Sequence, residues 1–120
     1  MAEDDRDLQR LYEILLGMSG FQVLGIANNG EEAIKMFRLF TQKPDIIILD
    51  YRMPIKNGID ALKEILQLDH NSRVIFASAD KTIKEEVYSY GAMEFLDKPF
   101  THQKLIHTLN KCLNTINIKE

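Results

Sequence analysis

Apolar residues recur with two different spacings along this chain, and the two spacings alternate. Spacings of three and four positions predict amphipathic helices at about residues 5–19, 31–42, 59–68, 82–90 and 102–114. Short apolar runs between them predict strands at about residues 21–27, 45–50, 73–78 and 95–96. The run from Ile46 to Leu49 is apolar throughout, which is typical of a strand that is covered on both faces.

The alternation of strands and helices predicts an α/β fold. Strand–helix–strand crossovers build a doubly wound parallel sheet with helices on both faces. The 120 residues suit one domain, which we place at residues 1–114, followed by a tail at residues 115–120. In such folds the functional side chains gather in the loops at the carboxyl ends of the strands.

Composition narrows the function classes. Lys plus Arg number 15 and Asp plus Glu number 18, so 15 − 18 gives a net charge of −3, which disfavours nonspecific nucleic-acid binding. The apolar runs are too short to span a bilayer, and we find no signal peptide. One cysteine, Cys112, excludes an internal disulfide. We therefore expect a cytoplasmic protein that binds neither membrane nor nucleic acid.

A few polar side chains stand where the predicted strands end or a helix begins. Glu3 and Asp4 precede the first helix, Asp50 and Ser78 each end a strand, and Lys98 follows the last one. If the strands are parallel, these groups converge on one edge of the sheet. Clustered carboxylates make chemical sense around a hard divalent cation such as Mg²⁺, which prefers oxygen ligands.

Four segments resemble the receiver domains of response regulators, in particular the chemotaxis type. Asp50–Gly58 resembles the phosphoacceptor loop of that family, and Phe76–Ala79 its hydroxyl-bearing strand end. Gly91–Phe100 resembles the family's lysine–proline segment, and the Glu3–Asp4 pair resembles its acidic metal pocket. The resemblance covers residues 2 to about 114. It implies a flavodoxin-like fold with a five-stranded sheet and a function in two-component signalling.

The resemblance implies a role for each residue at this edge. Asp50 becomes the nucleophile that accepts a phosphoryl group, and Glu3, Asp4, Asp50 and the main-chain carbonyl of Arg52 hold Mg²⁺. Helix capping is the alternative role for Glu3 and Asp4.

The remaining groups surround the phosphoryl position. Lys98 contributes a positive charge and Ser78 a hydrogen bond to the phosphoryl oxygens, and the small Ala79 leaves the phosphoryl group a way in. Termination of a strand is the alternative role for Ser78, and a solvated surface charge the alternative for Lys98. The family also implies a cis bond between Lys98 and Pro99.

Two further pairs of residues concern the output and lifetime of the phosphorylated state. Ser78 and Phe95 occupy the family's switch positions, although Phe95 also suits a plain core position. The switch would act on a face made by the helix at 82–90, the strand at 95–96 and the last helix. Arg52 and Asp80 lie two residues beyond Asp50 and Ser78, so we expect an ion pair that hinders the hydrolytic water; the alternative is two independent exposed charges.

The leading interpretation is a single-domain response regulator rather than an enzyme, with at most slow self-dephosphorylation. It receives its phosphoryl group from a sensor histidine kinase or phosphotransfer protein and signals through a protein partner. One alternative is a pseudo-receiver that serves only as an interaction module. The other is an aspartyl-phosphate phosphohydrolase, for which Arg52 stands where a general acid is expected.

The chain departs from the family at its amino end. The family has a strand of about five residues before its acid pair, whereas only Met1 and Ala2 precede Glu3 here. Without that strand, its two neighbours would be left with unpaired edges beside a gap in the core. The alternating residues 115–120 could fill this position as a strand, either within one chain or in a strand-swapped homodimer; a helical or frayed tail is the alternative.

Overall fold

A computed structural model describes the backbone of residues 1–119 and the side chains of residues 1–114. The elements, in chain order, are α1 (Arg6–Met18), α2 (Gly30–Leu39), β1 (Ile47–Asp50), α3 (Gly58–Leu68), β2 (Val74–Ser78), the short 3₁₀ helix η1 (Lys81–Ile83), α4 (Lys84–Ser89), β3 (Glu94–Asp97) and α5 (His102–Lys119). Within residues 1–119, no helix is both long and apolar enough to cross a membrane.

Short polar side chains fix the amino ends of the helices. Asp5 caps α1, because its Oδ1 accepts hydrogen bonds from the backbone N–H groups of Asp7 and Leu8. Asn57 caps α3 in the same way, and the Thr101 hydroxyl oxygen accepts from the Lys104 N–H at the start of α5. The predicted helices are confirmed, except that η1 takes the first residues of the predicted fourth one.

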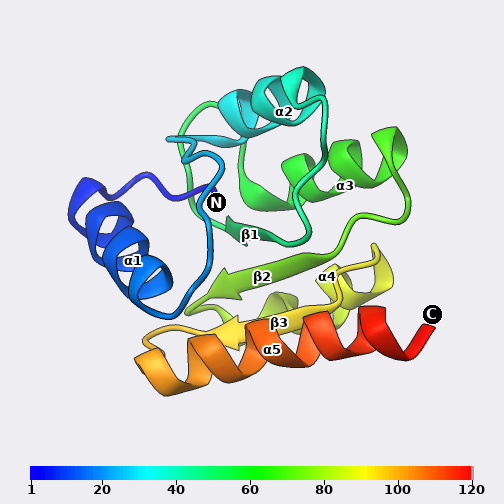
Figure 1. The fold of residues 1–120 in the computed structure, drawn as a ribbon. Coiled ribbons are helices and arrows are strands. Elements are labelled where there is room, and N and C mark those ends of the chain that lie inside the picture. Colours follow the sequence, from blue (N-terminus) through cyan, green and yellow to red (C-terminus); the bar gives the residue numbers. More distant parts are fainter. Residues whose placement is uncertain (120) are drawn as a thin grey trace.

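The sheet has the strand order β1-β2-β3, and both pairings are parallel. Leu49, Phe76 and Phe95 lie in register across its centre. Helices α2 and α3 cover one face, whereas α1 and α5 cover the other (Figure 1). This arrangement confirms the predicted doubly wound α/β fold and brings the carboxyl ends of all three strands to one edge.

The first residues of the chain lie beside β1. Ala2 forms parallel bridges to both Ala27 and Leu49, so it takes a position between them in line with the sheet. The strand predicted at residues 21–27 is reduced to its bridge at Ala27, because Met1 and Glu3 form backbone hydrogen bonds with its last residues, Gly25 and Ala27. On the amino side of Met1, where the sequence predicts a gap, a cleft of about 580 Å³ opens.

The strand hypothesis for the tail is wrong. Helix α5 continues through Lys119, so the backbone of residues 115–119 is helical; Glu120 lies outside the described residues. A continued helix pairs its N–H groups along its own backbone, which an isolated strand could not do. The helical backbone also contradicts the strand-swapped form, which needs the same residues extended.

Candidate functional site

Asp50 ends β1 at the edge where the strands terminate. Its N–H donates to the carbonyl oxygen of Ala2 at 3.0 Å, and it lies in register with Ala77 of β2. The residue is only 9% exposed, yet no buried polar atom of its side chain lacks a partner. A nearly buried carboxylate at this position needs a compensating positive charge.

Lys98 supplies that charge. Its backbone N–H donates to the carbonyl oxygen of Ser78 at 3.0 Å, which ties the end of β3 to the end of β2, and its bond to Pro99 is cis, as the resemblance implies. The ammonium lies 2.7 Å from Glu3 Oε1 and 3.0 Å from Asp50 Oδ1. Desolvation lowers the pKa of Lys98, but the two carboxylates outweigh it, so the pKa is raised and the side chain stays charged.

Glu3, Asp4 and Asp50 form an acidic cluster. One carboxylate oxygen from each lies within 4.8 Å of the other two. Glu3 is buried and its N–H donates to the Ala27 carbonyl, whereas Asp4 is exposed. Partial burial is the main cause that raises the pKa of Asp4, and a hydrogen bond to Glu3 raises this pKa further.

The charge and chemistry of this cluster fit a divalent cation. Three carboxylates and one ammonium leave a formal charge of −3 + 1 = −2 at this edge. The oxygen donors are hard ligands that lie close together, and one of them belongs to the exposed Asp4. Mg²⁺ prefers such carboxylates and retains waters on its remaining positions, so the residues present suit it.

Ser78 and Phe95 lie where the sequence predicts them. Ser78 ends β2, is buried, and accepts a hydrogen bond from the Asp80 N–H at 2.9 Å. Phe95 lies in β3 with its side chain buried, and its ring stacks on that of Phe76 at a centroid distance of 6.3 Å. This inward state of the Phe95 ring makes no hydrogen bond that a rotation outward would break.

The expected Arg52–Asp80 ion pair is present, though it is long and open to water. Arg52 Nη2 lies 3.7 Å from Asp80 Oδ2, and the Arg52 side chain is 80% exposed. Hydrogen bonds from Thr82 lower the pKa of Asp80 more than Arg52 does. Ala79, between Ser78 and Asp80, is exposed and leaves this side of the edge open.

Two residues that position the site escape the sequence prediction. Gln9, on α1, donates its Nε2 hydrogens to the Glu3 carbonyl and, at 2.8 Å, to Asn28 Oδ1, so it fixes the backbone of the acid pair. Gly58 packs so closely on Asp50 that a Cβ there would lie 2.0 Å from the Asp50 carbonyl oxygen. Gly58 belongs to the quoted motif, and its role could have been inferred there; Gln9 gives no such signal because its contacts are distant in sequence.

Comparison with known proteins points in one direction. The family model described as "Response regulator receiver domain" matches residues 1–110. The chemotaxis protein CheY of Thermotoga maritima is 34% identical over 113 residues, which cover 92% of each chain. Among solved structures, the CheX–CheY–BeF₃–Mg²⁺ complex of Borrelia burgdorferi is similar with a TM-score of 0.89 and 27% identity, covering 93% of this chain and 85% of that one. The Thermotoga maritima response regulator TrrA, in complex with Mg²⁺–BeF, has a TM-score of 0.82 and 28% identity, covering 92% and 94%.

Proposed function

Because the chain belongs to the response regulator receiver domains, we propose that it accepts a phosphoryl group on Asp50 from a histidine kinase or phosphotransfer protein. One observation carries the proposal. The nearly buried Asp50 carboxylate at the end of β1 contacts the Lys98 ammonium and belongs to an acidic cluster. A structural aspartate at a strand end needs neither partner.

Glu3, Asp4, Asp50 and the main-chain carbonyl of Arg52 would hold Mg²⁺, which when bound neutralises the phosphoryl oxygens as they approach the carboxylates. In the transfer, an oxygen of Asp50 forms a bond to phosphorus while the bond from phosphorus to the donor histidine nitrogen breaks and leaves its electron pair on that nitrogen. Lys98 then exchanges part of its contact with Asp50 Oδ1 for a phosphoryl oxygen.

Rearrangements of Ser78 and Phe95 carry the effect of phosphorylation to the protein surface. A phosphoryl group adds about −1.5 to −2 charges and three acceptor oxygens, so the Ser78 hydroxyl turns toward it and gives up its hydrogen bond with the Asp80 N–H. The space that Ser78 leaves lets the Phe95 ring take a deeper rotamer. Phe95 belongs to β3, between α4 and α5, so the face made by α4, β3 and α5 is the proposed site for an output protein.

A pseudo-receiver is the second candidate, because Asp4 is exposed and lies beyond the bridges at Ala2, so the sheet does not hold this metal ligand directly. The phosphohydrolase alternative has less support, since Arg52 points an exposed guanidinium toward Asp80 and offers no general acid.

Incubation with acetyl phosphate and Mg²⁺, followed by intact-protein mass spectrometry, separates these candidates. The proposal predicts one phosphoryl adduct per chain that is lost in Asp50→Asn and absent without Mg²⁺. Asp60→Asn is the matched control, because Asp60 is an exposed aspartate in the first turn of α3, and it should leave the adduct unchanged. Absence of any adduct would favour the pseudo-receiver, and steady release of phosphate without an adduct the hydrolase.

A further inference from the structure

Ile55, in the loop between β1 and α3, has a backbone conformation that is unusual for its residue type. Its φ of 68° lies in the left-handed region, and within residues 1–119 it is the only residue besides glycines found there. The Lys56 N–H donates to the Pro54 carbonyl at 2.7 Å, so Ile55 is the central residue of a three-residue turn. A branched Cβ makes this conformation strained, whereas glycine adopts it freely.

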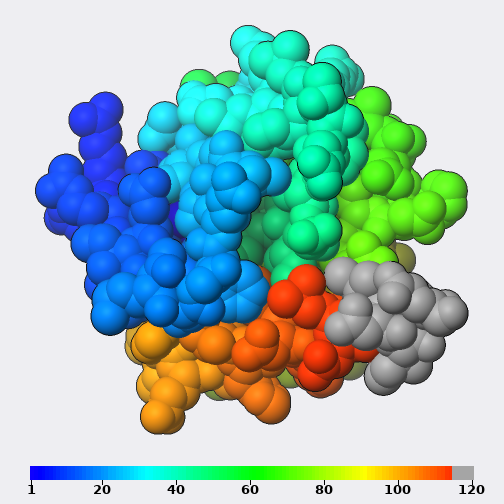
Figure 2. Space-filling model, viewed as in Figure 1, coloured from blue at the N-terminus to red at the C-terminus, as the bar shows by residue number. Residues whose placement is uncertain are grey.

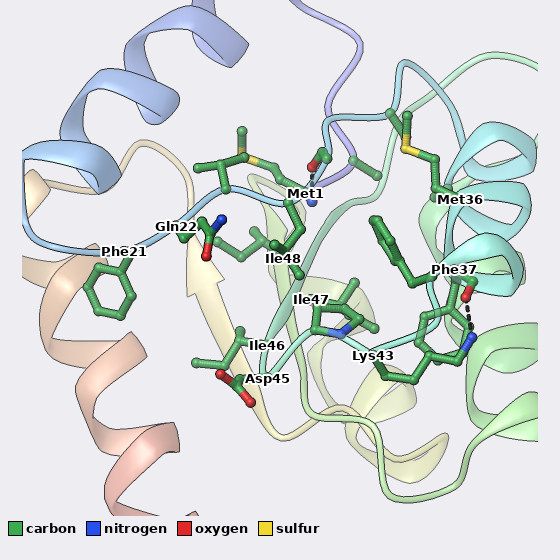
Figure 3. A pocket seen from close by; sticks show the side chains of 18 of the residues that line it. Met1, Phe21, Gln22, Met36, Phe37, Lys43, Asp45, Ile46, Ile47 and Ile48 are labelled. Carbon is green, nitrogen blue, oxygen red and sulfur yellow. Dashed lines mark hydrogen bonds between the residues drawn. The ribbon is translucent and has the colours of Figure 1, made fainter.

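The Ile55 side chain gains little packing within the chain in return for this strain. It is 83% exposed. The large cleft beside β1 is lined by other residues, Phe21 and Ile46 among them, so Ile55 does not serve to close it (Figure 3). A single exposed apolar side chain needs no special explanation, but here exposure coincides with strain. The combination points to a contact that Ile55 makes outside its own chain.

The turn that carries Ile55 is tied to two helices. The Lys56 carbonyl accepts a hydrogen bond from the Gly30 N–H at 2.9 Å, at the start of α2. The Lys56 ammonium lies 3.3 Å from Glu31 Oε2 on α2 and 2.6 Å from Glu64 Oε1 on α3. A side chain on a turn that is already fixed loses less conformational freedom when a partner covers it.

Ile55 also lies within reach of any protein that docks over Asp50. The Gly58 N–H donates to the Tyr51 carbonyl at 2.9 Å, so the loop folds back onto the end of β1, where Gly58 packs on Asp50. Ile55 precedes Gly58 by three residues, so their Cα atoms are at most about 11 Å apart. A standard interface covers about 800 Å² on each partner, which is a patch with a radius of about 16 Å. An interface centred on Asp50 therefore extends to Ile55.

We propose that Ile55 is an apolar anchor for the protein that donates the phosphoryl group, and that the donor surface beside its phosphorylated histidine has an apolar hollow for this side chain. The inference rests on the proposed transfer to Asp50 and adds to it a residue that selects the donor. Burial of one isoleucine side chain corresponds to about a ten- to hundredfold gain in affinity. A small donor such as acetyl phosphate has no surface that reaches Ile55.

Comparison of a protein donor with acetyl phosphate tests the proposal on the full chain. The histidine kinases and phosphotransfer proteins of the same organism are phosphorylated on histidine, and the one that transfers fastest to the unchanged chain is the probe. Ile55→Asn removes the apolar side chain but suits the turn, because asparagine tolerates a positive φ. It should lower the second-order rate constant with the protein donor about tenfold or more and leave the rate with acetyl phosphate unchanged. The loss should appear in the half-saturating concentration, with the maximal rate unchanged.

Leu39→Asn is the matched control. Leu39 is 81% exposed, but it lies at the opposite end of α2 from Gly30, roughly 13 Å along the helix. Figure 2 shows α2, in cyan, at the top of the molecule. Leu39→Asn should therefore leave transfer from both donors unchanged. Ile55→Leu keeps an apolar side chain and should retain about a third or more of the rate constant with the protein donor.

Ile55→Gly separates recognition from folding. Glycine relieves the turn, so this variant should melt a few degrees above the unchanged chain while it accepts the phosphoryl group from the protein donor about tenfold more slowly. A lower melting temperature, an equal loss with both donors, or no loss with the protein donor would overturn the proposal. A chain that acetyl phosphate modifies but no protein donor does would also overturn it. If acetyl phosphate gives no adduct either, the proposed transfer to Asp50 is itself wrong, and this inference fails with it.

Discussion

Substitution of Gly58 by alanine tests how closely the site is built against α3. A Cβ at this position would lie 2.0 Å from the carbonyl oxygen of Asp50 and 3.1 Å from Cε2 of Phe76. Ordinary contacts between nonbonded heavy atoms lie near 3.5 Å, so α3 or the Asp50 backbone must move by more than an ångström. Forced shifts of a packed backbone cost about 2–3 kcal/mol.

That cost translates into a measurable melting shift. For a domain of this length, 1 kcal/mol corresponds to about 4 °C, so Gly58→Ala should melt roughly 8–12 °C below the unchanged protein in a circular dichroism scan. The yield of the phosphoryl adduct should also fall, because the backbone that moves carries Asp50.

Gly17 provides the matched control. It lies in α1, and a Cβ there would have no heavy atom within 4 Å. Alanine is the better helix former by up to about 1 kcal/mol, so Gly17→Ala should melt at the same temperature or a few degrees higher. If Gly58→Ala melts as high as Gly17→Ala, the close approach of α3 to Asp50 is not as described.

Three other predictions concern charges. Lys98→Met leaves the Glu3 and Asp50 carboxylates without their cation and should lower the free energy of unfolding, measured with urea, by about 3 kcal/mol. Saturating Mg²⁺ should restore part of this loss, and an unchanged stability would contradict the shared ion pair. Arg52→Ala and Asp80→Ala should each shorten the lifetime of the phosphorylated state, and unchanged lifetimes would remove the pair from that role. Burial lowers the pKa of the Met1 amino group from 8.0 to about 6, so the unfolded chain binds its proton first as the pH falls. The free energy of unfolding should therefore drop by about 2 kcal/mol between pH 8 and pH 6, and acetylation of the amino terminus should remove that slope.

The sequence predicts the sheet where each strand has a neighbour. The Ile-rich run that ends at Asp50 is apolar on both faces, and it pairs with β2 as expected. The extended residues 21–27 have strand-like composition too, but a strand is defined by its partners. Met1 and Glu3 pair with its last residues, Gly25 and Ala27, so a local pattern overestimates the pairing of the whole segment.

The same distinction applies to the site. Asp50, Ser78 and Lys98 could be predicted because each ends a strand, and the ends of parallel strands meet at one edge. Gln9 could not, because it looks like any polar residue on an amphipathic helix until α1 is placed against the Glu3 backbone. The strand prediction for residues 115–120 was wrong for a similar reason. Alternation over six residues suits a strand but does not exclude a helix.

Locating the phosphoryl group along the chain decides whether Asp50 is the phosphoacceptor. Borohydride reduces an aspartyl phosphate to homoserine and releases phosphate, so the modified residue can be read by peptide sequencing in a mass spectrometer. After treatment with acetyl phosphate and Mg²⁺, we expect homoserine at position 50 and at no other aspartate. Homoserine elsewhere, or none in a protein that carries the adduct, would contradict it.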